Sequence, residues 1–320
     1  MDLVLAFDPS LFVDQLTAGL TLGAVYALIA LGYTMIYGIL KLLNFAHGDV
    51  YMIGAYVGYF VLTGFGGPLN PSLPLVPLIL LMFLVAMLGC GFLGVVIERF
   101  AYRPLRNAPR IAPLITALGI SFFLESSAQL LFGAQIRSYD TFSLHNGVLL
   151  FKGIHTTIYG VRFDLSLVRI IVIVSAVTLM VALTLLVNRT ALGKAMRATS
   201  FDREAAAMMG IDVDRVIVAT FFIASALAGA AGVMVGLVFF QVSNFMGFQA
   251  GLKAFTAAVV GGIGNIPGAM LGGFLVGIAE SFAEGYWSSE FKDAIVFGML
   301  IAFMLLRPTG LLGTRAIQKV

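Results

Sequence analysis

Apolar stretches long enough to cross a bilayer recur along this chain, separated by short polar segments. The hydrocarbon core of a bilayer requires about 20 apolar residues in a helix. The stretches that meet this length lie at 13–38, 46–64, 73–98, 111–132, 167–187, 216–240 and 290–306. The pattern predicts an all-α, polytopic integral membrane helix bundle formed by one domain over residues 1–320.

A further apolar stretch, 253–280, is interrupted in its middle by the sequence GGIGNIPGA. Backbone groups that such a break releases must bind protein or water, because lipid offers no hydrogen-bond partner. We therefore predict a broken or re-entrant pair of short helices here, or two short spans.

Composition supports lipid as the main solvent. The 320 residues are 60% hydrophobic and 11% charged, whereas a soluble domain carries about 25% charged residues. The single cysteine, Cys90, excludes an internal disulfide framework. No run of lysine and arginine indicates binding to nucleic acid.

Basic residues gather in three segments and predict the orientation. They are Arg99, Arg103, Arg106 and Arg110, then Arg189, Lys194, Arg197, Arg203 and Arg215, and finally Arg307, Arg315 and Lys319. The positive-inside rule places all three segments in the cytoplasm. The N-terminus is then outside and the C-terminus cytoplasmic, provided that 253–280 leaves and returns on one side. The first apolar stretch is expected to be a retained span, since it lacks a basic n-region and a cleavage site.

The loop 133–166 is external in this arrangement. Its run VLLFKGIHTTIYGVRF places β-branched and aromatic residues around glycine, which predicts a small β-hairpin. It is either a docking surface or a solvated connector.

Small residues recur four apart at five places, Gly19/Gly23, Gly54/Gly58, Gly232/Gly236, Gly268/Gly272 and Gly273/Gly277. This spacing gives one helix face a flat strip that allows close approach of a neighbouring backbone. Helix packing explains most of these pairs.

The segment 188–215 is too charged to enter lipid. Thr199 is a candidate N-cap, with Asp202 three residues later, and Gly210 is a candidate stop. The intervening FDREAAAMM predicts a helix of about ten residues, roughly 15 Å long. Ala206 and Met209 would share one side. Such a helix could insert into a groove of another protein, or it could only link two spans.

Polar residues at the start of the second span form the sequence NFAHGD. Asn44 could cap the helix, Asp49 would be favoured by the helix dipole, and His47 could partner Asp49 or backbone groups. A capped and internally bonded helix entry explains the three residues better than a proton relay.

Glu125 lies in the outer half of 111–132, with Gln129 one turn later. A charge at that depth is costly unless it faces the bundle interior or a wet cavity. Glu125 is therefore a candidate for the transport pathway, where it could meet an ammonium group, or a structural hydrogen-bonding residue. Glu98 is explained more simply, by pairing with Arg99 at the interface.

The break at 261–265 is a third candidate for the pathway. A half-helix that starts there would expose N–H groups suited to a carboxylate, and Gly262, Gly264 and Asn265 are the residues concerned. The simpler explanation is that these glycines let a hairpin turn inside the protein.

Several enzyme signatures are missing from the sequence. It has no G-x-x-x-x-G-K-[ST] phosphate loop, no Cys/His set with zinc spacing and no G-x-S-x-G elbow. We expect no metal, no cofactor and no catalytic residue. ATP-driven transport would then require a separate ATPase chain.

Three segments resemble a known family. Glu204, Ala205 and Ala206, followed by Gly210, look like the EAA-x3-G loop of ABC-importer permeases. The segments 19–56, 193–216 and 254–280 resemble branched-chain amino acid permeases of the LivH type in the same order, so that the resemblance covers essentially the whole chain. It identifies the docking residues of a coupling helix as Asp202, Glu204, Ala205, Ala206, Met209 and Gly210.

The resemblance also implies partners and a location. These are a second homologous permease chain, two ABC ATPase subunits, an extracytoplasmic substrate-binding protein and the bacterial inner (plasma) membrane. Related permeases carry urea or short amides, and that substrate stays open. An ion-coupled secondary transporter would need midplane carboxylates, for which Glu125 is the one fair candidate. A passive channel or scaffold would leave the coupling segment unexplained.

Overall fold

The computed structural model describes residues 9–65, 74–106, 108–109, 111–139, 153–158 and 161–313. Its long helices are α1 (Pro9–Leu40), α2 (His47–Phe65), α3 (Leu75–Ile97), α4 (Ile111–Phe132), α6 (Leu167–Arg189), α9 (Val213–Phe239), α10 (Met246–Gly261), α11 (Ile266–Tyr286) and α12 (Lys292–Leu306). Six of the described helices are long and apolar enough to cross a membrane, and they are α1, α3 with its extension, α4, α6, α9 and α11. The predicted polytopic helix bundle is confirmed, and each predicted span contains a helix.

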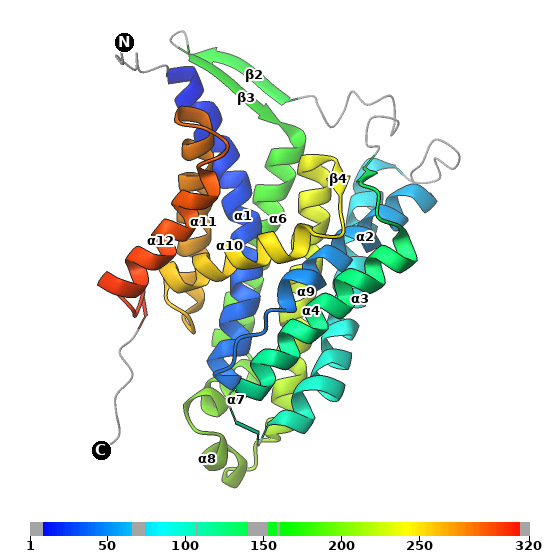
Figure 1. The fold of residues 1–320 in the computed structure, drawn as a ribbon, viewed down its shortest axis with the longest axis vertical. Helices are drawn as coiled ribbons and strands as arrows, with labels where there is room; N and C mark the ends of the chain where they lie inside the picture. The colour runs from blue at the N-terminus through cyan, green and yellow to red at the C-terminus, as the bar shows by residue number, and fades with distance from the viewer. Residues whose placement is uncertain are drawn as a thin grey trace.

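Short elements lie at the two ends of the bundle (Figure 1). One end carries the antiparallel hairpin of β2 (Gly153–Ile158) and β3 (Val161–Ser166), in which Gly153 lies opposite Ser166. The other end carries α7 (Ala191–Phe201) and α8 (Arg203–Met208). We call these the hairpin end and the α8 end. The predicted hairpin is confirmed.

Four more short elements adjoin the long helices. The π-helical turn η1 (Glu98–Tyr102) and the 3-10 turn η2 (Arg103–Leu105) continue α3. The strands β1 (Arg137–Ser138) and β4 (Gln241–Val242) pair antiparallel. This pairing joins the segment after α4 to the segment after α9.

Helices α1 and α9 form the centre of the bundle. Within the apolar 18-residue stretch of each helix, 83% of α1 and 78% of α9 is buried, against 28% of α4 and of α6. The peripheral helices expose large apolar side chains such as Phe122, Phe123, Leu130, Leu131 and Val174. Apolar surface of this extent on bilayer-length helices fits contact with lipid or with another membrane chain.

Glycines bring α1 and α11 into backbone contact. A Cβ added to Gly277 would lie 2.7 Å from the carbonyl oxygen of Gly19. A Cβ added to Gly23 would lie 2.7 Å from the Cα of Phe274. Both distances are far below van der Waals contact, so only glycine fits. The close approach predicted from the Gly19/Gly23 and Gly273/Gly277 spacings is confirmed.

The predicted break lies between α10 and α11, and other protein segments satisfy its backbone. Gly262 and Gly264 adopt φ of +111° and +92°, which favours glycine. The Leu311 N–H donates to Val260 at 2.9 Å, and the Leu312 N–H donates to Gly261 at 3.0 Å. Helix α10 crosses α1 obliquely, and α11 returns toward the hairpin end (Figure 1).

Candidate functional site

The polar residues of the NFAHGD sequence lie inside the bundle rather than at its end. The side chain of His47 packs against Gly32 and meets the ring of Tyr33 edge-on, with ring centroids 5.0 Å apart. Gly32 precedes Leu40, the last residue of α1, by eight residues, so His47 contacts α1 roughly 12 Å from its end at 1.5 Å per residue. His47 is the first residue of α2, as predicted, but its side chain is fully buried against α1.

The partners of these residues also differ from the prediction. Asn44 accepts a hydrogen bond from the Tyr102 hydroxyl at 2.9 Å instead of capping α2. His47 makes no hydrogen bond to Asp49 among the described residues, and the backbone of Ile29 in α1 is its polar neighbour, which fits the backbone alternative. Tertiary contacts with α1 and η1 replace the local ones, because the start of α2 is buried.

Asp49 of α2 makes a polar contact with α4. Its fully buried side chain accepts a hydrogen bond from the Ser121 hydroxyl, while its Oδ1 has no partner among the described residues. Glu125 follows Ser121 by one helical turn and is half-buried, whereas Gln129 is exposed. The structure thus brings Asp49 and Glu125 into one region and directs Gln129 outward.

The glycines and the asparagine of the break have structural partners. The Asn265 side chain caps α11 by accepting from the Gly268 N–H at 3.1 Å, and it donates to the carbonyl of Leu312 at 2.6 Å. Gly262 lies against Gly310 and Gly313. These contacts fit the interpretation of Gly262, Gly264 and Asn265 as a protein-held turn.

At the α8 end, an ion network ties α3 to α9. Glu98 is fully buried and pairs with Arg106, not with Arg99 as expected. Arg106 also pairs with Asp214 at the start of α9, and Arg103 reaches the same carboxylate at 2.8 Å. Removing one member of a buried ion pair leaves an uncompensated charge. This network therefore fixes the two helix ends relative to each other.

The predicted ten-residue helix is divided into two elements. Thr199 is buried within α7 and is not a cap, while Thr190 caps α7. Asp202 caps α8, accepting from the backbone N–H groups of Glu204 at 3.0 Å and Ala205 at 3.1 Å. The extended backbone of Asp202, with φ −155° and ψ 116°, ends α7 and limits α8 to six residues.

Gly210 ends the α8 segment as predicted, with φ of +83°. The N–H groups of Gly210 and Ile211 donate to Ala207 and Ala206, at 3.0 and 3.1 Å, which closes the helix. Ala206 is only 4% exposed, whereas Met208 and Met209 are each 82% exposed. The expectation that Ala206 and Met209 share one side is wrong, because Ala206 packs inward while its neighbours in the segment are exposed, namely Glu204, Ala205, Ala207, Met208 and Met209.

Helix α8 is attached to the end of α1. The Arg203 guanidinium donates two hydrogen bonds to the carbonyl of Ile39, at 2.7 and 3.2 Å. The pKa of the neighbouring Lys41 ammonium is lowered, first by partial burial and second by the positive charge of Arg203. A displacement of α8 would thus act directly on the central helix.

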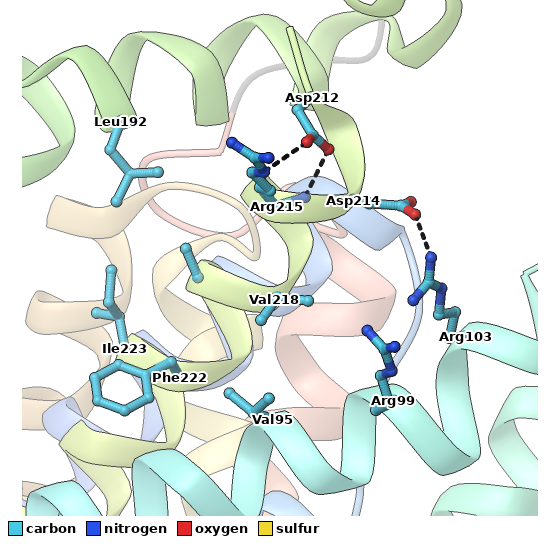
Figure 2. A pocket seen from close by; sticks show the side chains of 11 residues that line it. Val95, Arg99, Arg103, Leu192, Asp212, Asp214, Arg215, Val218, Phe222 and Ile223 are labelled. Carbon is cyan, nitrogen blue, oxygen red and sulfur yellow. Dashed lines mark hydrogen bonds and ion pairs between the residues drawn. The ribbon is translucent and has the colours of Figure 1, made fainter.

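A cavity of about 710 Å³ opens between α3, α7 and α9 near this ion network (Figure 2). Val95, Phe222 and Ile223 form apolar walls, with Leu192 of α7 across from them. Its charged rim contains the pair of Arg215 and Asp212, at 2.8 Å. The cavity lies between α7 on one side and α3 and α9 on the other. It therefore leaves space beside α7, the helix that precedes α8.

A second cavity, of about 170 Å³, lies between α1, α2, α9 and α10. On its wall is Lys253, which pairs with Glu280 of α11 and Asp293 of α12, each at 2.6 Å. The Tyr26 hydroxyl donates to the other oxygen of Glu280 at 2.9 Å. Lys253 and Glu280 are buried, whereas the Asp293 side chain is 51% exposed. We call the three residues the buried ion cluster after its first two members.

Sequence reasoning missed the buried ion cluster, although a signal was present. Lys253 and Glu280 are the first and last residues of the interrupted stretch 253–280, and no other charge lies between them. Opposite charges at the two ends of a predicted helical hairpin come close together when the hairpin folds. Among the described residues, no group of His, Cys, Asp and Glu side chains is arranged to hold a metal ion.

Comparisons with known proteins agree over the full length of the bundle. Residues 15–304 match the family described as "Branched-chain amino acid transport system / permease component". The high-affinity branched-chain amino acid transport system permease protein BraD of Pseudomonas aeruginosa (PAO1) is 42% identical over 309 residues, covering 97% of this chain and 98% of BraD. LivH of Escherichia coli K12, a permease protein of the same description, is 41% identical over 320 residues, with coverage of 97% and 98%.

A more distant relative has the same general description. LivM of Salmonella typhimurium LT2, also named a high-affinity branched-chain amino acid transport system permease protein, is 27% identical over 317 residues, covering 91% of this chain and 68% of LivM. The family match spans most of the chain, and the identity to BraD and LivH is high over nearly all of it. This chain therefore belongs to the family of permease components of branched-chain amino acid transport systems.

Proposed function

We propose that this chain is the membrane-spanning permease subunit of an ATP-driven importer for branched-chain amino acids in the bacterial inner membrane. The observation that carries the proposal is the 41–42% identity to BraD and LivH over 97% of the chain. Because the sequence has no phosphate loop of its own, ATP hydrolysis is assigned to two separate ATPase subunits. An extracytoplasmic binding protein delivers the substrate, and the N-terminus lies outside with the C-terminus in the cytoplasm.

The α8 segment is the proposed contact with the ATPase. Its docking residues are Asp202, Glu204, Ala205, Ala206, Met209 and Gly210, of which Asp202 and Gly210 set the helix ends and Ala206 packs inward. Exposed methionines suit an apolar groove, because the side chain is flexible and polarisable. Movement of α8 then reaches α1 through Arg203 and Ile39.

A second, homologous permease chain is proposed to cover α4. Glu125 and Gln129 are polar groups on a bilayer-length helix that is largely exposed in the single chain. A carboxylate that faces lipid at that depth costs several kcal/mol, so another protein surface or a wet pathway would stabilise it. The similarity to LivM supports a homologous partner. Asp49, His47 and Asn44 would form the wall behind this pathway.

Substitution of Glu125 by glutamine tests this placement. Loss of the charge removes one charge-assisted contact in the pathway, and we expect reconstituted uptake to fall about tenfold. Ser126→Ala, at an exposed position beside it, is the control and should leave uptake unchanged. Unchanged uptake by the Glu125→Gln variant would show that Glu125 is not part of the pathway.

The function itself is tested with the complete complex in liposomes. We expect ATPase activity to rise when the binding protein is loaded with leucine, isoleucine or valine, and not with urea or short amides. If urea alone stimulated the ATPase activity, the substrate would be urea rather than a branched-chain amino acid. Labelled leucine that accumulates without ATP would contradict the importer mechanism and favour an ion-coupled transporter.

A further inference from the structure

The cavity beside the buried ion cluster is lined by both polar and apolar side chains. The polar ones include Lys253 and Gln249 of α10, Tyr26 of α1 and Tyr51 of α2. The apolar ones are Val235 and Phe239 of α9 and Met246 and Ala250 of α10. The cavity is thus built by helices that are far apart in sequence and that meet at the centre of the bundle.

Lys253 has hydrogen-bonding capacity left for a ligand. An ammonium group has three donors, and two of them are directed to Glu280 and Asp293. The third is free to serve an acceptor in the cavity, whose wall the side chain forms. The Lys253 side chain is nearly buried, and a buried ammonium in a membrane protein points to a pathway or binding role, since it is expensive to bury for packing alone.

The cluster also sets how strongly a ligand is held. One ammonium and two carboxylates carry a single net negative charge, so an anion alone is repelled while a zwitterion brings its own ammonium. Because two carboxylates already hold Lys253, a substrate carboxylate competes with them and binds weakly. Weak binding suits a transport step, in which the substrate must also leave.

We propose that this cavity is a stopping place for the transported amino acid, with the Lys253 ammonium on the α-carboxylate. The aliphatic side chain of the substrate packs against Val235, Phe239 and Met246, and its ammonium faces the oxygens of Tyr51 and Gln249. This inference rests on the proposed function and assigns the substrate-binding residues within this chain. The competing explanation is that the ion cluster only ties α10, α11 and α12 together.

Two single variants separate these explanations in the reconstituted complex. Lys253→Gln removes the cavity ammonium, and leucine uptake per ATP hydrolysed is expected to fall about tenfold or more, the scale of one charged contact. Glu280→Gln removes one of the two carboxylates that compete for Lys253 but leaves it paired with Asp293 and on the cavity wall. The leucine concentration that half-saturates uptake is therefore expected to fall about threefold, the scale of one hydrogen bond, while uptake is retained. Equal losses in both variants would overturn the proposal in favour of a purely structural tie.

A third variant covers the case in which Lys253→Gln does not fold. The triple variant Lys253→Met/Glu280→Gln/Asp293→Asn removes every charge of the cluster together, so that no buried charge lacks a partner. It is expected to assemble and to keep ATPase stimulation by the loaded binding protein, while losing leucine uptake. Normal uptake by an assembled triple variant would overturn the proposal.

Direct contact is tested with a diazirine analogue of leucine during turnover. Crosslinks are expected on the peptides that contain Phe239 and Met246, and they should be lost in Lys253→Gln or in the triple variant. Crosslinks confined to other helices would overturn the proposed site. If the unsubstituted complex itself shows no leucine-stimulated ATPase activity, the proposed function fails, and this outcome is distinct from the loss of crosslinks in an active complex.

Discussion

Met208→Glu together with Met209→Glu should leave the permease folded but abolish its co-purification with the ATPase subunits. Both side chains are 82% exposed, so their replacement does not alter the packed core or the free energy of unfolding appreciably. In a docked complex the two carboxylates would be buried in an apolar groove without partners. The cost of burying them is several kcal/mol, which weakens binding at least about a hundredfold.

The matched control places the same charge at another exposed position of the α8 end. Ala191 is the exposed first residue of α7, where a glutamate is favoured by the helix dipole. Ala191→Glu should retain both the ATPase subunits and transport. If the double methionine variant co-purifies with the ATPase subunits as well as the control does, α8 is not the docking element.

Gly277→Leu is expected to prevent accumulation of the folded permease in the membrane. The added side chain would have to enter the contact between α1 and α11, where the carbonyl oxygen of Gly19 lies 2.7 Å from the position of a Cβ. The atoms that a new side chain would meet belong to the backbone of Gly19 and Gly23. Backbone atoms do not move aside as a flexible side chain does. Overpacking of this kind costs about 3 kcal/mol or more.

Gly298 of α12 provides the control for this substitution, because a Cβ added there meets no atom within 4 Å. Gly298→Leu should accumulate normally, as measured by fluorescence-detected size-exclusion chromatography of the solubilised protein. The two variants add the same apolar side chain to a membrane helix and differ in the space around it. Equal yields from both would show that the α1–α11 contact is not tight in the membrane.

The sequence was most informative where one physical requirement dominates. Apolar length predicts the spans, because lipid imposes it on every helix that crosses. Glycine predicts the break and the stop at Gly210, since a positive φ excludes most other residues. The β-branched and aromatic residues around glycine in the run VLLFKGIHTTIYGVRF predict the hairpin.

Local reasoning was wrong where tertiary contacts compete with local ones. Asn44 has the chemistry of a helix cap, but the Tyr102 hydroxyl reaches it from η1. Thr199 and Asp202 are both residues that cap helices, and the sequence alone does not show which one the backbone uses. Glu98 pairs with Arg106, eight residues later in the segment that continues α3, rather than with Arg99, because adjacent residues of a helix do not face each other.

The candidate pathway was only partly predictable for a related reason. Glu125 is visible as a charge inside an apolar helix, and Asp49 lies in a polar sequence. Lys253 lies at the edge of an apolar stretch, which is also the position expected of a residue at the membrane interface. One of its two ion-pair partners, Asp293, comes from α12, forty residues later in the chain.

The buried ion cluster has a consequence for how the chain enters the bilayer during synthesis. Helix α10 has 16 residues and carries the ammonium of Lys253, so it is a poor candidate for insertion by itself. The carboxylate of Glu280 on α11 neutralises that charge once both helices are present. We therefore expect α10 to wait at the translocon until α11 has emerged from the ribosome, and the two helices to partition into lipid as one hairpin.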